Sequence, residues 1–275
     1  MEKSGLPIRE FAYFDREKVV DFVSAWQGGL PEIRKRITSD KSARLDFGLK
    51  AWFLGLMRRG GTKELTWEEI QSETNASLFE RLHNLLEERQ SITNLESFNA
   101  DIWEQLKVGE FVEVLVNIEF SALERLFDLL RGFSEMAEKL GLEQIHDSNW
   151  ASIVNYVNLL VSKQEDYNIR MTQVGAPSEK FMFVASLSKD KTRASKAQLA
   201  SEYTVFGRLQ HKLIEKETFE LQRLLPIDVQ LPSEQVDDFL KGFKDMPSIL
   251  GSPPKKEDLA ITYPAIILTP IAIYR

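Results

Sequence analysis

Positively charged side chains that could bind an anion are gathered in two short tracts of the chain. These side chains are, in chain order, Arg34, Lys35 and Arg36, followed by Lys189, Lys191, Arg193 and Lys196. Guanidinium groups form paired hydrogen bonds with phosphate or carboxylate, and lysine adds a compact point charge. The two tracts therefore predict contacts with an anionic ligand or an acidic protein partner. The alternative is that both tracts are solvated loops with nothing bound.

The net charge of −7 is spread unevenly along the chain. Residues 31–63 hold nine basic and three acidic residues, a net charge of +6, which leaves −13 for the rest of the chain. The second tract is offset only by Asp190. Basic islands on an acidic background are typical of sites that hold an anion, a nucleic-acid backbone or an acidic partner.

Residue types that build the common active sites are scarce. There is no cysteine, which excludes disulfides and cysteine–zinc sites, and there is neither a G-x-S-x-G motif nor a phosphate-binding loop. His146, Asp147 and Ser148 are adjacent, so they cannot converge as a catalytic relay, and we interpret them as the polar start of a helix. His83 and His211 lack a second histidine at metal-ligand spacing.

We therefore expect a non-catalytic protein with no catalytic residues, no metal and no cofactor. The expected roles are binding, sensing or scaffolding. An unrecognised hydrolase or nuclease is kept as an alternative, because a fold can assemble an active site from residues that are distant in sequence.

The elements that must position the basic tracts begin with a strand at residues 9–14. Asp15 follows where a helix N-cap belongs, since its carboxylate can accept the free amides of a first turn. A helical stripe of apolar side chains comes next, and Gly28 and Gly29 end the helix. The stripe consists of Val19, Phe22, Val23 and Trp26.

Residues 45–95 raise the alternative of nucleic-acid binding. A helical stripe runs from Leu45 to Leu56, and the pairs Thr66/Glu69 and Ser77/Glu80 are typical of capping boxes that open two more helices. A short strand at 91–95 completes the order of a winged helix-turn-helix. The would-be recognition helix, SLFERLHNLLEERQ, carries several glutamates that phosphates would repel, so this function ranks second.

The second half of the chain is predicted to be rich in strands. Residues 109–120 alternate apolar and polar side chains, and Ser121 with Glu124 is typical of a capping box that opens the next helix. Further strands are expected at 167–174, 180–188, 202–213, 217–224 and up to Arg275, with residues 189–201 as a longer connection. Two strand–helix successions on one chain favour a sheet with helices packed on it.

The predicted fold class is α+β, a mixed sheet with packed helices. We expect a helix-rich N-terminal part at 1–160, with strands near 9–14 and 109–120, and a strand-rich part at 161–275, together forming one compact unit. The N-terminal residues have no apolar segment typical of a signal peptide, and no stretch has the roughly 18 to 20 apolar residues of a spanning helix. We therefore expect a cytoplasmic protein without membrane insertion.

Four segments, in order, resemble a family of uncharacterised bacterial proteins with a domain of unknown function. The segments are REFAYFDREKVVDFVSAWQGGL, SLFERLHNLLEE, EYTVFGRLQHKL and PAIILTPIAIYR. They match the family's Y-x-D…G-G helix unit, its T-V-x-G strand and its closing P-I-A-I-Y strand. The chain departs at Leu209, where valine is expected, and at Trp26, where a smaller apolar residue is expected. The resemblance implies no activity, catalytic residues or cofactor, and it implies a loose association with stress or anti-phage defence loci.

Overall fold

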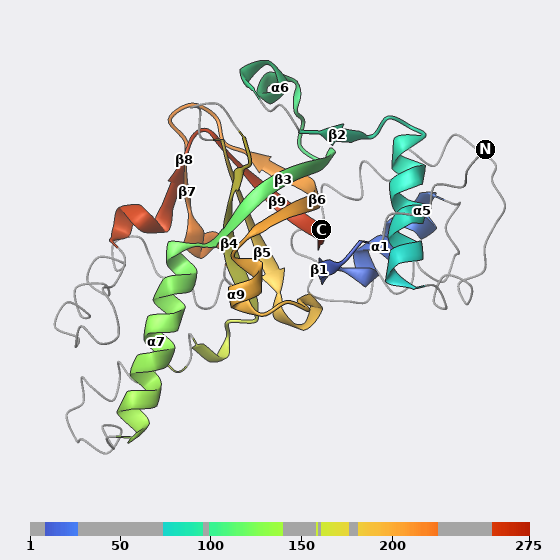
Figure 1. The fold of residues 1–275 in the computed structure, drawn as a ribbon. Helices are drawn as coiled ribbons and strands as arrows, with labels where there is room; N and C mark the ends of the chain where they lie inside the picture. The colour runs from blue at the N-terminus through green and yellow to red at the C-terminus, as the bar shows by residue number, and fades with distance from the viewer. Residues whose placement is uncertain are drawn as a thin grey trace. The chain divides into compact units, whose positions relative to one another are not determined.

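A computed structural model describes residues 9–26, 74–95, 99–139, 158, 161–175, 181–224 and 255–275. In these ranges the chain forms helices and a mixed sheet, so the predicted α+β class is confirmed (Figure 1). The strands are β1 (Phe11–Phe14), β2 (Ile92–Asn94), β3 (Phe111–Phe120), β4 (Asp166–Gln173), β5 (Met182–Ser188), β6 (Glu202–Lys212), β7 (Thr218–Glu220), β8 (Ala260–Thr262) and β9 (Ala265–Tyr274). The α-helices are α1 (Arg16–Trp26), α5 (Asn75–Glu87), α6 (Ala100–Gln105), α7 (Ala122–Lys139) and α9 (Lys196–Leu199).

The main sheet pairs its strands in the order β1-β9-β5-β4-β3-β2, and β6 pairs with both β3 and β9. The pairs β1/β9, β3/β4 and β4/β5 are antiparallel, whereas β2/β3 and β5/β9 are parallel. Because β6 closes a ring of pairings with β3 and β9, the sheet is partly barrel-like. A separate antiparallel pair joins β7 to β8.

The chain divides into two compact units. Unit 1 comprises residues 1–115, 203–210 and 269–275, and unit 2 comprises residues 116–202 and 211–268.

In unit 1, α1 and α5 pack together, as the blue and turquoise helices of Figure 1 show. Asp15 caps α1 as predicted, because its Oδ1 accepts the backbone N–H of Lys18 at 3.2 Å. The apolar stripe of α1 is buried at Val19, Phe22 and Val23. These side chains join an aromatic core in which the Phe79 ring lies 5.2 Å from that of Tyr274.

The start of α5 differs from the prediction. The N-cap is Thr74, whose hydroxyl accepts the backbone N–H of Ser77 at 3.2 Å, so the predicted Ser77/Glu80 capping box is wrong. Three residues of helix therefore precede the predicted start. The apolar side that was predicted for this helix is buried at Leu78, Phe79, Leu82 and Leu86, while Leu85 is half-buried.

Gly207 on β6 lies where two backbones pass close to each other in unit 1. A Cβ atom at this position would lie 2.9 Å from the carbonyl oxygen of Thr269 on β9, closer than side-chain carbons approach. The close passage of two backbones therefore requires glycine here.

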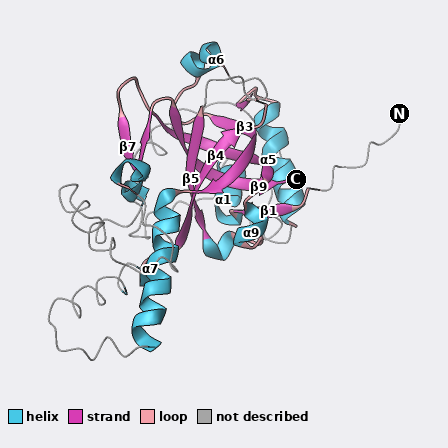
Figure 2. Ribbon diagram, turned by 60° about the vertical axis from the view of Figure 1, so that its left-hand side comes forward, coloured by secondary structure: helices cyan, strands magenta, loops and turns pink. Residues whose placement is uncertain are grey.

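In unit 2, the C-terminal half of β3 pairs with β4, and β4 pairs with β5 along seven residue pairs. The first turns of α7 lie against β4 (Figure 2). Leu123, Phe127 and Leu130 bury one side of α7 in an apolar core.

Two expectations for unit 2 need revision. The strand predicted at 217–224 ends at Glu220, where a 3-10 helix (Leu221–Leu224) begins. The connection at 189–201 also carries ordered structure, a 3-10 helix (Lys189–Lys191) and α9, which begins at a capping box of Ser195 and Gln198.

Candidate functional site

A fully buried carboxylate, that of Glu124 in the first turn of α7, lies at the centre of the strongest polar cluster in unit 2. Ser121 caps this helix as predicted, since its Oγ accepts the backbone N–H of Glu124 at 3.2 Å. The reciprocal half of the capping box does not form, because the Ser121 N–H donates to the carbonyl oxygen of Asn168 at 2.9 Å. The Glu124 carboxylate is therefore left to accept other donors.

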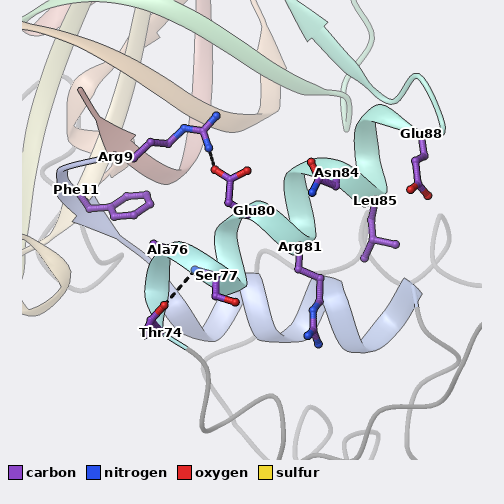
Figure 3. A pocket seen from close by; sticks show the side chains of 10 residues that line it. All are labelled: Arg9, Phe11, Thr74, Ala76, Ser77, Glu80, Arg81, Asn84, Leu85 and Glu88. Carbon is purple, nitrogen blue, oxygen red and sulfur yellow. Dashed lines mark hydrogen bonds and ion pairs between the residues drawn. The ribbon is translucent and has the colours of Figure 1, made fainter. Parts of the chain in front are cut away.

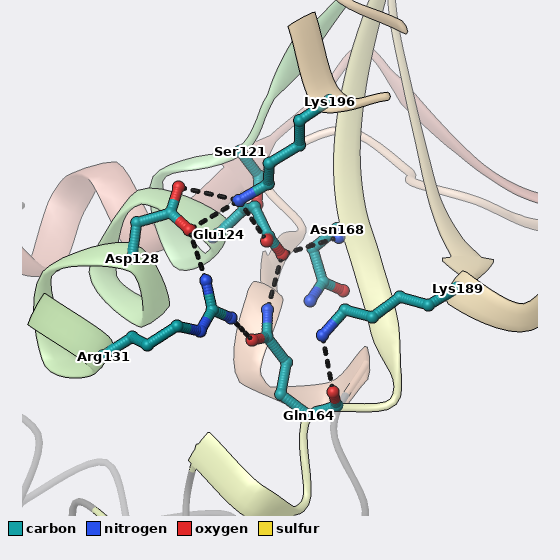
Figure 4. Close-up of polar contacts among 8 residues, drawn as sticks. All are labelled: Ser121, Glu124, Asp128, Arg131, Gln164, Asn168, Lys189 and Lys196. Atoms are coloured by element: carbon teal, nitrogen blue, oxygen red, sulfur yellow. Dashed lines mark hydrogen bonds and ion pairs between the residues drawn. The ribbon is translucent and has the colours of Figure 1, made fainter. Parts of the chain in front are cut away.

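Those donors come from β4, the residues before it, and the basic tract. Gln164 Nε2 donates to Glu124 Oε2 at 2.7 Å, and the backbone N–H of Asn168 donates to the same oxygen at 3.2 Å. The Nζ of Lys196 lies 2.6 Å from Glu124 Oε1 (Figure 4). Burial of a carboxylate is costly unless it is paired and hydrogen-bonded, and Glu124 meets both conditions.

Lys196 also binds Asp128, one turn further along α7, at 2.6 Å and 2.7 Å from its two carboxylate oxygens. Arg131 supports this arrangement from the next turn, donating to Asp128 Oδ1 at 3.0 Å and to Gln164 Oε1 at 2.8 Å. The network thus ties three turns of α7 to the start of α9. It anchors the basic tract on the surface of unit 2.

Lys189 reaches the same cluster from the end of β5. Its Nζ donates to the backbone carbonyl of Gln164 at 2.6 Å and lies 5.3 Å from the centre of the Tyr167 ring. Burial lowers the pKa of the Lys189 amine, and the neighbouring cations Arg131 and Lys196 lower it further, while Glu124 acts in the opposite direction.

Each predicted site residue now has a place, where the structure describes it. Lys189 and Lys196 meet in the Glu124 cluster, Lys191 is half-buried in the 3-10 helix, and Arg193 is exposed. The residues of the first tract, Arg34, Lys35 and Arg36, lie outside the described residues. Whether these seven residues contact a ligand stays a prediction.

The roles of Glu124 and Asp128 as acceptors of the cluster were not predicted from the sequence. Glu124, Asp128 and Arg131 lie four and three residues apart, which places them on one face of α7. This spacing was the available signal. Nothing local in the sequence indicates that the donors to Glu124 come from residues 40 and 72 positions later.

A second candidate is a pocket of about 610 Å³ along one side of α5 in unit 1 (Figure 3). It is lined by Arg9, Phe11, Thr74, Ala76, Ser77, Glu80, Arg81, Asn84, Leu85 and Glu88. Arg9 is ion-paired with Glu80, and its guanidinium lies 5.1 Å from the centre of the Phe79 ring and 5.0 Å from that of Tyr274. The lining contains two arginines and two glutamates, so its charges balance and favour no one class of ligand.

The two described histidines face carboxylates. The buried His83 places Nε2 3.3 Å from Glu113 and Nδ1 3.5 Å from Glu87, and His211 Nε2 lies 2.7 Å from Glu217. Over the part of the chain that the structure describes, no group of three or more histidine, aspartate or glutamate side chains is arranged to hold a metal ion. Within that same part, no helix has the length and apolar character needed to cross a membrane.

Comparison with known proteins places the chain in one family. The model of the family DUF6414, described as a domain of unknown function, matches residues 8–274, so the chain belongs to this family. No curated protein and no solved structure matches it.

Proposed function

We propose that this protein is a non-catalytic binding module that docks an acidic protein partner or another anionic ligand through its basic tracts. The observation that carries this proposal is the anchoring of the second tract by the buried Glu124. A charged segment whose backbone is already fixed loses less conformational freedom when a partner binds. The ion pairs of Lys196 fix the backbone of the tract, so its neighbouring side chains can bind a partner at a smaller entropic cost.

The four basic residues of the second tract divide into two roles under this proposal. Lys196 is saturated by Glu124 and Asp128, so it positions the tract. Arg193 is exposed, and among the described residues its guanidinium has no ion-pair partner, so it is the first contact for a carboxylate or phosphate. Lys189 and Lys191 add positive charge beside it, and Arg34, Lys35 and Arg36 are proposed as the second contact group.

We further infer the setting from the family resemblance. The binding module would act in the bacterial cytoplasm, in a stress or anti-phage defence system. The lack of cysteine is compatible with a reducing compartment.

The test starts with capture of partners by the full chain from its native host at low salt. Mass spectrometry would identify the bound protein, nucleotide or nucleic acid, and titration calorimetry with the purified partner would follow. Reversal of the contact charge by Arg193→Glu should weaken binding by about tenfold at 0.1 M salt, and the triple reversal of Arg34, Lys35 and Arg36 should weaken it at least as much. The matched control is Lys216→Glu, an exposed lysine of the same unit outside the tract.

The proposed contacts would be overturned if the purified partner binds Arg193→Glu, the triple variant and the control with equal affinity. The second function, nucleic-acid binding by residues 45–95, would be favoured if the bound ligand is a nucleic acid whose affinity depends steeply on salt. For each phosphate contact, the affinity should then fall about tenfold when the salt concentration rises tenfold. Turnover of a nucleotide or nucleic acid with divalent metal would favour the third, a hydrolase or nuclease.

A further inference from the structure

The carboxylate of Asp128 lies between two cations at the solvent side of the Glu124 cluster (Figure 4). Lys196 Nζ lies 2.6 Å and 2.7 Å from its two oxygens, and Arg131 Nη1 donates to Oδ1 at 3.0 Å. The Asp128 side chain is 46% exposed, so solvent reaches this position. An anion from outside the chain can therefore compete with Asp128 for the same two donors.

Both cations are also held by groups other than Asp128. The Nζ of Lys196 lies 2.6 Å from an oxygen of the fully buried Glu124, and Arg131 Nη2 donates to Gln164 Oε1 at 2.8 Å. Donors that are fixed before a ligand arrives lose less conformational freedom when they bind it. The pair of cations is thus an anion site that the fold has already assembled, with a side chain of the same protein as its occupant.

The presence of this occupant decides which anions can bind. Asp128 belongs to the same chain, so its effective concentration at the two donors is high. A carboxylate from a partner would repeat the same contacts and gain nothing over Asp128. A phosphate monoester carries nearly two negative charges and three acceptor oxygens near neutral pH, so it can bind an ammonium and a guanidinium at once.

The charge of the cluster also favours a dianion. When the Asp128 carboxylate turns to solvent, the charged groups that remain are three cations and two carboxylates, which leaves one positive charge. These groups are Lys189, Lys196, Arg131, Glu124 and Asp166. An exposed ion pair contributes little to stability, so the release of Asp128 costs little.

We propose that Lys196 and Arg131 form a binding site for the phosphoryl group of a phosphate monoester, which displaces Asp128 as an internal competitor. No covalent bond is made or broken. The inference rests on the proposed function, because it narrows the anionic ligand of the second tract to a phosphorylated one. Lys196 keeps its ion pair with Glu124 in the bound state, so it still positions the tract.

The experiment is a titration of the full-length protein with inorganic phosphate near pH 7.5 at constant ionic strength, followed by the amide NMR signals of α7 and of residues 189–199. Asp128→Asn removes the competitor and should tighten phosphate binding about threefold or more. Arg131→Gln removes a donor and should weaken it by a similar factor. The matched control is Asp190→Asn, the same charge change at an exposed residue of the tract, which should leave the affinity within about twofold.

Acetate, titrated in the same way, should bind the unmodified chain more weakly than phosphate does. The proposal is overturned if neither the unmodified chain nor Asp128→Asn binds phosphate, if the two bind it equally, or if Asp190→Asn tightens binding as much as Asp128→Asn. Acetate that binds as tightly as phosphate would overturn the phosphoryl class.

Two further ligands identify the source of the phosphoryl group. Tighter binding of a phosphoserine peptide than of a nucleoside monophosphate would support a phosphorylated protein, and the reverse order would support a nucleotide. Failure of this inference can be told apart from failure of the proposed function. If Arg193→Glu weakens binding of the purified partner while Asp128→Asn leaves the phosphate affinity unchanged, the phosphoryl site is wrong and the binding module stands.

Discussion

Removal of the Lys196 ammonium is the most direct test of the Glu124 cluster. Lys196→Met keeps much of the aliphatic chain and leaves the fully buried Glu124 carboxylate without its cation. Deleting one partner of a buried ion pair costs about 3–5 kcal/mol. The Lys196 side chain is 28% exposed, and Glu124 keeps its hydrogen bonds from Gln164 and Asn168, so we expect about 2–3 kcal/mol.

The matched control concerns the other partner of the same lysine. Asp128 is 46% exposed, so Asp128→Asn breaks a pair that water already screens, and the expected loss is at most about 1 kcal/mol. The double variant Lys196→Met/Glu124→Gln should be less destabilised than the sum of its single changes, by about 1–2 kcal/mol, because the unpaired charge is gone.

The assay is urea unfolding of the full chain combined with amide hydrogen exchange, which reports α7 and β4 separately from unit 1. The protection of α7 and β4 should fall in Lys196→Met while that of α1 and α5 stays the same. A loss of less than about 0.5 kcal/mol for Lys196→Met, or a larger loss for Asp128→Asn, would refute the reasoning that burial makes the Glu124 pair the stronger one.

Three further predictions concern single residues. Gly207→Ala should lower the free energy of unfolding by about 1–3 kcal/mol, because the new Cβ would lie 2.9 Å from a backbone oxygen. Gly175→Ala should lower it by only about 1 kcal/mol, because Gly175 has a φ of 72° but open space around it. Urea unfolding compares the two variants. The pKa of Glu217 is lowered chiefly by the backbone N–H of Ile214. The ionised carboxylate therefore stabilises the folded chain above the unfolded-state pKa near 4.5, and this stabilisation is lost as pH falls through the folded-state pKa. The free energy of unfolding should depend less on pH between 3 and 6 in Glu217→Gln. The pKa of Lys189 is lowered too, so the free energy of unfolding should rise with pH between the folded-state pKa of Lys189 and its unfolded-state pKa of about 10.5. A pH series of urea unfolding should show a weaker rise in Lys189→Gln.

Periodic burial made several elements predictable. Along β3, Val112, Val114, Val116 and Ile118 are buried while the residues between them are half-buried or exposed, which is the alternation that the sequence shows. The strand predicted at 9–14 and the Asp15 cap of α1 were found by equally local signals. These elements depend on the side-chain pattern of a few neighbouring residues.

The cap of α5 was harder to predict, because two residues compete for the same role. Thr74 and Ser77 both carry hydroxyl groups three residues before another polar residue, and Thr74 takes the cap. Glu80 is then free to pair with Arg9, which lies 71 residues earlier in the chain. Such long-range contacts carry no local sequence pattern.

The candidate site shows the same limit. Lys189 and Lys196 were recognised as charged residues, but their acceptors come from elsewhere, Gln164 before β4 and Glu124 on α7. A sequence read alone treats the tract as positive surface. In the folded chain, part of that charge is neutralised internally, because the fold brings a buried carboxylate to it.

The division of the chain has a practical consequence for anyone who wishes to dissect it. The polypeptide passes from one unit to the other at residues 115/116, 202/203, 210/211 and 268/269. A stop codon placed after β5 would delete strand residues from both units at once, and no single cut separates them. Variants made for crystallisation or interaction screens should therefore keep the whole chain and change internal loops, rather than divide the chain into halves.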